Sequence, residues 1–499
     1  MVEYRVMEGV YMKSNNTFAN RMSDLASQTR TENGAIAYWT SSNVLVDLFG
    51  TIGALRNTDK DRLFRMIDGA YTQDKLLLAK MLFYARDIRG GLGERETFRT
   101  AINYCALRYP NIIKDNIKLI PEYGRWDDLF ALIDTPLEDD MWAYVKTVYD
   151  QDLDAVKSGN NNISLLAKWL PSADASSENT RKRGCYAAKR LSESVYKYKR
   201  EVKSMRRVID TIEAHISAKD WHTYDYSKVP SNAMLKYTSA FYRNDGERYA
   251  QYISDVSEGK VKINSSTLYP ADIIKKLTYT YDNEVCQQLW NNLPNYVEGE
   301  NNFIVMADVS GSMTGDPMFS SIGLAIYFAE RNKGAFKNLF MTFSANPKFV
   351  TIPEHYSLYG KYKLALGSEW GMNTNIEAAF RAILQVAIDS ETKPEDMPKS
   401  LIIITDMEFD MATRNEDPIF DEMKMLFDEA GYEMPNVVFW NVDSRNETYH
   451  VKADEPRVQL VSGRSTSTFK NLIEGLNKTP YEMMIQALSS KRYDPITVE

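Results

Sequence analysis

The sequence is poor in the residues that build disulfides and zinc sites. Its 499 residues include three cysteines, Cys105, Cys185 and Cys286, which lie far apart and share no short spacing. This excludes a disulfide framework and a thiolate metal site, and we expect reduced cysteines in a cytoplasmic protein. The four histidines show no metal-ligand spacing either, so a zinc enzyme is not expected.

Long apolar runs are also missing. No run of about eighteen apolar residues occurs, which excludes a membrane-spanning helix. The segment Met1–Tyr11 mixes charged and apolar side chains and lacks the apolar core of a signal peptide. We therefore expect a cytoplasmic protein that has neither a membrane nor DNA as its partner.

Positive charge does not exceed negative charge overall, but it is concentrated in one segment. The formal net charge is −8, whereas Arg181–Arg207 opposes many lysines and arginines with only Glu193 and Glu201. Such a segment suits a phosphate backbone, and tyrosines among the cations can stack on unpaired bases. The alternative is a solvated helix face. The candidate RNA-binding residues are Arg181, Lys182, Arg183, Lys189, Arg190, Tyr196, Lys197, Tyr198, Lys199, Arg200, Lys203, Arg206 and Arg207.

The first part of the chain, residues 1–299, is patterned as successive helices. Apolar residues recur at helical spacing over Asn43–Arg56, Asp74–Arg86 and Glu96–Leu107, with short breakers between them. Helices of this length in antiparallel pairs resemble an α-solenoid of HEAT type. The glycine-rich segment Arg89–Arg95 lacks the Gly-Lys-Ser/Thr ending of a phosphate-binding loop, so it is interpreted as a helix–helix corner.

From residue 300 to residue 499 the pattern alternates between strands and helices. The expected strands are Asn302–Asp308, Leu339–Ser344, Leu401–Asp406, Val437–Asp443 and Val458–Ser462, and the expected helices are Phe319–Arg331, Ile376–Ile388, Pro418–Glu429 and Tyr481–Ser489. This alternation predicts a doubly wound, Rossmann-like parallel sheet with right-handed crossovers. Lys348–Ile352 follows its predecessor too closely for a crossover and is predicted to pair antiparallel at an edge. The predicted fold class is therefore α + α/β.

Polar oxygens gather at the predicted ends of two of these strands. Asp308, Ser310 and Ser312 follow the first strand, and Asp406 ends another, while Thr374 precedes the helical run that begins at residue 376. Ligand sites of parallel α/β sheets lie at this carboxyl edge. Oxygen-only ligands suit a hard divalent cation, with Mg²⁺ expected first and Mn²⁺ or Ca²⁺ as alternatives. Strand-end turns that bind nothing are the other interpretation.

The same five residues resemble the metal-ion-dependent adhesion site of von Willebrand factor A domains. The resemblance implies that Ser310 and Ser312 bind the metal directly, that Asp308 and Asp406 act largely through water, and that Thr374 binds directly or through water. In that family an open metal position accepts a carboxylate or phosphate of a partner. The site is then a binding device.

The order of the two parts, together with five further stretches, resembles the TROVE/Ro ribonucleoprotein family and, more closely, a related family of phages, bacteria and eukaryotes. The stretches are Thr31–Ala35, Arg89–Arg95, Glu122–Leu129, Leu166–Pro171, and Val229–Ser231 with Ala233 and Met234. In Ro proteins helical repeats grip single-stranded or small structured RNA and the A domain sits at the closure of the ring.

Two functions stay open on this basis. One is a non-catalytic RNA-binding protein, whose helical repeats grip RNA while the A domain binds a cation and a partner. The other is a metal-dependent protein-interaction module that captures an acidic residue of its partner and binds no RNA. We predict no catalytic residue and no enzyme, because no pairing of a nucleophile with a base emerges from the sequence.

Overall fold

The chain folds into two compact units that are not continuous in sequence. The computed structural model describes residues 27–279, 284–297, 302–344, 346–368, 375–409, 419–475 and 477–499. One unit, called the sheet unit here, contains the residues up to Asp74 together with Tyr269–Trp290 and Pro294–Ser490. The other, the helical unit, contains Lys75–Leu268, Asn291–Leu293 and Lys491–Glu499. This division differs from the predicted boundary between residues 299 and 300.

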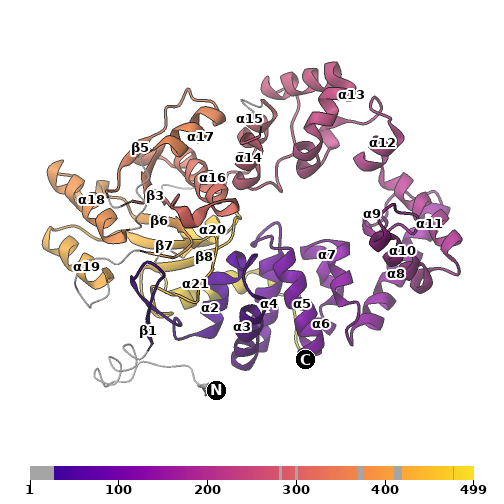
Figure 1. Ribbon diagram of the computed structural model, residues 1–499, viewed down its shortest axis with the longest axis horizontal. Coiled ribbons are helices and arrows are strands. Elements are labelled where there is room, and N and C mark those ends of the chain that lie inside the picture. Colours follow the sequence, from indigo (N-terminus) through magenta and orange to yellow (C-terminus); the bar gives the residue numbers. More distant parts are fainter. Residues whose placement is uncertain are drawn as a thin grey trace. The chain divides into compact units, whose positions relative to one another are not determined.

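The helical unit consists of helices joined by short connections. They are α4 (Lys75–Arg86), α5 (Glu96–Arg108), α6 (Pro110–Lys114), α7 (Ile120–Tyr123), α8 (Glu138–Lys157), α9 (Leu166–Trp169), α10 (Glu178–Leu191), α11 (Val195–Ile209), α12 (Ile212–Ala218) and α13 (Ser231–Ser257) (Figure 1). The predicted helices over Asp74–Arg86 and Glu96–Leu107 are confirmed. The HEAT type of repeat stays a prediction.

The glycine-rich segment between α4 and α5 is a tight corner, as the sequence indicated. A Cβ atom at Gly91 would lie 2.0 Å from the carbonyl oxygen of Tyr84, and Gly93 has a φ angle of 69°. Only glycine allows both the close approach and the left-handed backbone at low cost. The segment therefore turns the chain between two helices.

The last residues of the sequence belong to the interior of the helical unit. The Nη2 atom of Arg492 donates to Oδ1 of Asp87 at 2.7 Å, and the ring of Tyr493 stacks on that of Tyr123 with 5.7 Å between centroids. Asp87 has no exposed surface, so its charge depends on this partner. The segment Lys491–Glu499 is thus a structural part of the unit.

The sheet unit contains a six-stranded mixed sheet in the order β5-β4-β3-β6-β7-β8. The strands are β3 (Phe303–Ala307), β4 (Leu339–Thr342), β5 (Phe349–Thr351), β6 (Ser400–Thr405), β7 (Asn436–Asn441) and β8 (Val458–Ser462). All neighbouring pairs are parallel except β4 and β5. Both the predicted strands and the antiparallel edge at Lys348–Ile352 are confirmed. Every residue of β3, β6, β7 and β8 is buried, as expected for a sheet that is covered on both faces.

Helices cover the two faces of this sheet. Those that follow the strands are α16 (Asp316–Arg331), α17 (Leu358–Gly367), α18 (Ile376–Asp389), α19 (Ile419–Glu429), α20 (Thr468–Glu474) and α21 (Pro480–Leu488), and α14 (Pro270–Leu277) and α15 (Glu284–Asn291) precede the sheet. Figure 1 shows α18 and α19 on one side of the sheet and α16 with α20 on the other. Right-handed crossovers account for α16 lying opposite α18 and α19, because the strand order reverses beside β3. No helix in the described ranges is both long and apolar enough to span a bilayer.

The N-terminal segment of the sheet unit covers the edge strand β8. It contains the hairpin β1 (Gln28–Arg30) and β2 (Ile36–Tyr38), then α2 (Val44–Thr51) and α3 (Lys60–Gln73). Just after α2, a Cβ atom at Gly53 would lie 2.7 Å from the backbone of Ser462, and the Gly53 N–H donates to the Ser462 hydroxyl at 3.0 Å. An edge strand needs such cover. This packing explains why the N-terminal segment belongs with the sheet.

Candidate metal centre

The carboxyl ends of β3 and β6 form the candidate site. The two strands are parallel neighbours, and the direction of the strand order reverses beside β3. A crevice outside the strand ends is expected at such a reversal. Asp308 directly follows β3, and its N–H extends the ladder to the carbonyl oxygen of Ile404 at 2.9 Å. Asp406 directly follows β6, so both carboxylates stand at the same edge.

The loop after β3 orients its own polar groups. The backbone N–H of Ser310 donates to Oδ1 of Asp308 at 2.9 Å, and Thr405 of β6 donates its hydroxyl to Oδ2 at 2.8 Å. The hydroxyls of Ser310 and Ser312 lie 2.9 Å apart. One carboxylate and two hydroxyls are therefore held together before any ligand arrives.

Burial and the like charge of Asp406 disfavour the ionised form of Asp308. Asp308 is fully buried and Asp406 nearly so. Burial, followed by the charge of Asp406, raises the pKa of Asp308 to about 6. A divalent cation between the two carboxylates would relieve this repulsion. Among the described residues no group of three acidic, histidine or cysteine side chains is placed to hold a metal ion, so hydroxyls and water would complete the shell. That donor set fits Mg²⁺, which retains several waters.

The fifth predicted ligand, Thr374, lies outside the described residues. The helix behind it, α18, begins at Ile376 as the sequence predicted, and Asn375 caps it by accepting the Ala378 N–H at 3.0 Å. The structure thus brings four of the five predicted residues to one edge of the sheet.

Sequence reasoning missed two charged residues on the loop after β7. Arg445 donates from Nη2 to Oδ2 of Asp406 at 2.9 Å. Burial, followed by the charge of Asp406, raises the pKa of Asp443. The predicted strand Val437–Asp443 ended in aspartate, which is the signal that marked Asp406. Applied to this third strand, the same signal would have drawn attention to Asp443 and its neighbours.

The turn of the N-terminal hairpin lies on the loop after β6. Thr31 donates its hydroxyl to the carbonyl oxygen of Phe409 at 2.5 Å, and the backbone N–H of Glu32 donates to Oε2 of Glu408 at 2.8 Å. Asn33 donates its side-chain amide to the carbonyl oxygen of Glu408, also at 2.8 Å. The carboxylate of Glu408 therefore anchors the hairpin beside Asp406.

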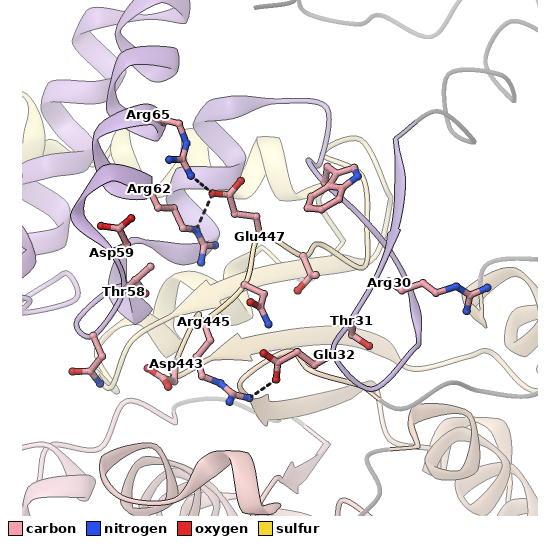
Figure 2. A pocket seen from close by; sticks show the side chains of 14 residues that line it. Arg30, Thr31, Glu32, Thr58, Asp59, Arg62, Arg65, Asp443, Arg445 and Glu447 are labelled. Carbon is pink, nitrogen blue, oxygen red and sulfur yellow. Dashed lines mark hydrogen bonds and ion pairs between the residues drawn. The ribbon is translucent and has the colours of Figure 1, made fainter. Parts of the chain in front are cut away.

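A cavity of about 600 Å³ opens between this N-terminal segment and the loop after β7. Figure 2 shows two groups of ion pairs in it: Arg62 and Arg65 point toward Glu447, and Arg445 points toward Glu32. The distances are 2.6 Å from Arg65 to Glu447 and 3.6 Å from Arg445 to Glu32. Arg445 therefore belongs to both the cavity and the candidate metal centre.

The predicted RNA-binding residues lie in the helical unit, on and between α10 and α11. Five cations are exposed and have no acidic partner among the residues that the structure describes: Arg183, Lys189, Arg200, Lys203 and Arg207. Tyr196 is 73% exposed. We call these six residues the basic surface.

Other members of the predicted set form ion pairs with acidic side chains or donate hydrogen bonds to backbone carbonyl oxygens. Lys182, Lys197 and Lys199 lie 2.8, 2.6 and 3.1 Å from Glu178, Glu193 and Asp174, and Arg190 pairs with Asp139. Arg181 donates to the carbonyl oxygen of Ala175 at 3.2 Å. These cations already have an acidic or carbonyl partner, whereas those of the basic surface have no acidic partner among the described residues.

Tyr198 and Arg206 have packing roles, which corrects their assignment to an RNA-binding surface. Tyr198 is 1% exposed, donates to the carbonyl oxygen of Pro171 at 2.8 Å and stacks on Tyr149. The guanidinium of Arg206 donates to the carbonyl oxygens of Ala167 and Leu170 at 2.8 and 2.5 Å. Both residues face the interior because they share the buried side of α11 with Val202 and Met205.

The chain is similar to two domain families, to a viral protein and to a solved structure. Residues 302–494 match the model of a domain of unknown function (DUF7788), and residues 31–150 and 176–298 match that of a second domain of unknown function (DUF2828). An uncharacterized protein of Acanthamoeba polyphaga mimivirus is 27% identical over 95% of this chain and 89% of its own length. The crystal structure of the Ro (RSR) protein of Deinococcus radiodurans covers 90% of this chain and 99% of its own, with 13% identity and a TM-score of 0.47. The two domain matches adjoin near the predicted boundary, whereas packing assigns residues 31–74 to the sheet unit.

Proposed function

We propose that this protein is a non-catalytic RNA-binding protein whose helical unit holds RNA while its sheet unit binds a divalent cation and a partner. In this proposal the sheet unit is a von Willebrand factor A-like domain with a metal-ion-dependent adhesion site, and the helical unit is a HEAT-like solenoid of the TROVE/Ro type. The observation that carries the metal-binding part of the proposal is the convergence of Asp308, Ser310, Ser312 and Asp406 at adjacent strand ends.

The side chains at the carboxyl ends of β3 and β6 support the binding of a divalent cation and, through it, of a partner. Ser310 and Ser312 would be direct ligands, with Asp308 and Asp406 as charged holders. A bound Mg²⁺ would supply an open coordination position for a carboxylate or phosphate oxygen. Two further carboxylates near the edge are engaged: Glu408 anchors the hairpin, and Asp316 pairs with Lys275 at 2.7 Å.

The basic surface supports RNA as the ligand. Its five cations have no acidic partner in the described part of the chain, so binding a phosphate costs them no existing ion pair. The exposed ring of Tyr196 adds a platform on which an unpaired base can stack. Phosphate contacts of this kind bind single strands with little sequence preference.

The second candidate function is the capture of an acidic protein at the cation, without RNA. Ion pairs with acidic side chains favour it; they are formed by Lys182, Arg190, Lys197 and Lys199. These pairs neutralise much of the positive charge of the predicted basic segment, as on a solvated helix surface.

Anisotropy titration of labelled single-stranded RNA, in Mg²⁺ and in EDTA, separates the two candidates. The proposal expects RNA binding that weakens as salt is raised. If no RNA binds even at low salt while Mg²⁺ still stabilises the protein in thermal melts, the protein-capture function takes its place. If Mg²⁺ has no effect on melting, the metal centre itself is rejected.

A further inference from the structure

We propose that the cavity beside the metal centre binds an oxyanion, a phosphate or carboxylate group, and that Arg445 makes oxyanion binding and metal binding strengthen one another. The inference rests on the metal centre of the proposed function and adds a second ligand to it. It is carried by the geometry of three of the four arginines that line the cavity, Arg62, Arg65 and Arg445.

Arg62 supplies a buried donor. Its guanidinium is fixed by two hydrogen bonds to Ser444, from Nη1 to the carbonyl oxygen at 2.9 Å and from Nη2 to the hydroxyl at 3.0 Å. The side chain is 4% exposed, and its Nε–H has no hydrogen-bond acceptor among the described residues. The carboxylate of Glu447 is 3.8 Å from Nε, beyond hydrogen-bond distance. An oxygen atom of a ligand would satisfy this donor.

Arg65 supplies a cation that can change partner. It lies on the same helix, α3, and pairs with Glu447 at 2.6 Å, with 64% and 41% of the two side chains exposed. Exposed ion pairs of this kind contribute little to stability, so an incoming oxyanion exchanges for Glu447 at low cost. Figure 2 shows both arginines directed at the same carboxylate, and thus at the position that an oxyanion would take.

Arg445 links this cavity to the metal centre. Its Nη2 atom is 2.9 Å from Oδ2 of Asp406 and 3.6 Å from Oε2 of Glu32, on the cavity side. A divalent cation held by Asp308 and Asp406 would repel the guanidinium and weaken its bond to Asp406. The side chain, 36% exposed, then turns to acceptors in the cavity, where an oxyanion binds it.

The coupling is reciprocal by thermodynamic necessity. An oxyanion that draws Arg445 away from Asp406 leaves the charge of that carboxylate uncompensated, so Asp406 attracts the metal more strongly and the metal binds more tightly. Metal that displaces Arg445 in turn raises the affinity of the cavity for the oxyanion by the same factor. Coupling of this kind commonly amounts to about fivefold to 150-fold in affinity.

Isothermal titration of the full-length protein with Mg²⁺ tests the inference. It is run without added anion, with inorganic phosphate and with acetate, each at matched ionic strength and free Mg²⁺. We expect at least one of the two anions to tighten Mg²⁺ binding by about fivefold or more. The anion that tightens Mg²⁺ binding shows whether the cavity prefers a tetrahedral phosphate or a planar carboxylate.

Two variants assign the effect to Arg445. Arg445→Gln should bind Mg²⁺ more tightly than the unaltered protein when no anion is present, and should lose the anion effect. Arg457→Gln is the matched control, because Arg457 is similarly exposed, at 38%, and is ion-paired to Glu433, but it bonds Asn436 at the amino end of β7. It should behave like the unaltered protein.

The outcomes separate this inference from the proposed function. Mg²⁺ binding that neither anion changes, or an Arg445→Gln variant that titrates like the unaltered protein, overturns the coupling and leaves the metal centre in place. Absence of Mg²⁺ binding in the unaltered protein overturns the metal centre and the coupling with it.

Discussion

Thr405, the last residue of β6, donates its hydroxyl to Oδ2 of Asp308, which follows the neighbouring strand β3, at 2.8 Å. This bond crosses from one strand end to the next and fixes the carboxylate that the candidate metal centre depends on. The same hydroxyl accepts the backbone N–H of Met407 at 3.1 Å. A single buried side chain therefore holds both loops that supply the site.

Replacing Thr405 by valine should test this arrangement. Valine keeps the shape but removes the hydroxyl, which leaves Asp308 and the Met407 N–H short of a partner at a buried position. We expect a loss of about 1–3 kcal/mol in the free energy of unfolding and weaker Mg²⁺ binding. Urea unfolding and calorimetric titration measure the two effects. Thr405→Ser, which keeps the hydroxyl, should retain Mg²⁺ binding; equal loss in both variants would contradict the role of the bond.

Replacing Asp308 by asparagine should separate metal binding from folding. The change removes one of two buried carboxylates, so the metal-free protein should melt at the same or a higher temperature. The additional stabilisation by Mg²⁺ should disappear, because it depends on cation binding to the folded state. Asp428→Asn, on the exposed side of α19, is the control with the same change in charge and should respond to Mg²⁺ normally. A normal response in Asp308→Asn would remove the site from consideration.

The basic surface should control RNA affinity through charge. Arg200→Gln combined with Lys203→Gln should weaken binding of single-stranded RNA and flatten the dependence of log affinity on log salt by about 0.7 for each phosphate that is no longer neutralised. Glutamine preserves helix propensity, so α11 should remain folded. The control is Lys157→Gln with Lys260→Gln, which removes equal formal charge from two ion-paired lysines elsewhere in the helical unit. Equal weakening in both double variants would mean that net charge alone acts.

Two tyrosines of α11, two residues apart, should respond in opposite ways. Tyr196→Ala should leave unfolding unchanged and cost about 1–3 kcal/mol of RNA binding if its exposed ring stacks on a base. Tyr198→Ala should destabilise the helical unit by about 3–5 kcal/mol, because it empties a buried aromatic position. Thermal melts and anisotropy titrations of both variants check this. An RNA defect in folded Tyr198→Ala, with none in Tyr196→Ala, would reverse the assignment.

His450 should make the sheet unit sensitive to acid. Its Nε2 atom lies 2.9 Å from the carbonyl oxygen of Met407, and burial lowers its pKa from 6.5 to about 4. The unfolded chain takes up this proton near pH 6.5 and the folded chain only near pH 4. The contribution of His450 to stability is therefore complete above pH 6.5 and is lost as the pH falls toward 4.

Unfolding of His450→Gln and of the unaltered protein between pH 4 and pH 7 measures this contribution. Stability should fall less steeply with acid in the variant, because glutamine takes up no proton. His355→Gln, which changes an exposed histidine of the same unit, is the control and should keep the original slope. Parallel curves for all three proteins would show that another group dominates.

The strands and the strand-end residues of the sheet unit could be predicted because their signals are local. Apolar runs such as Leu401–Ile404 are short and continuous, and a carboxylate directly after such a run must stand at the sheet edge. The partner of Asp406 could not be found in this way. Arg445 reaches it from another strand end, and only the three-dimensional order of the strands brings the two together.

Two other differences have distinct causes. The association of α2 with β8 joins residues about four hundred positions apart, and the sequence contains no local mark of such a contact. The buried side of α11 did have a mark: Tyr198, Val202 and Met205 follow helical spacing. The predicted RNA-binding set includes Tyr198 and Arg206 because it was defined by residue type alone, and helical spacing separates these inward residues from the exposed cations.

Lys491–Glu499 returns to the helical unit after α21 has completed the sheet unit. This arrangement limits how the gene for such a protein can be divided. A gene fragment that ends after Ser490 encodes every strand of the sheet but leaves Asp87 without the arginine that neutralises it. A fragment that begins at Lys75 loses the cover of β8. Neither unit can be exchanged or discarded as one uninterrupted stretch of coding sequence, because each is assembled from separate stretches of the chain.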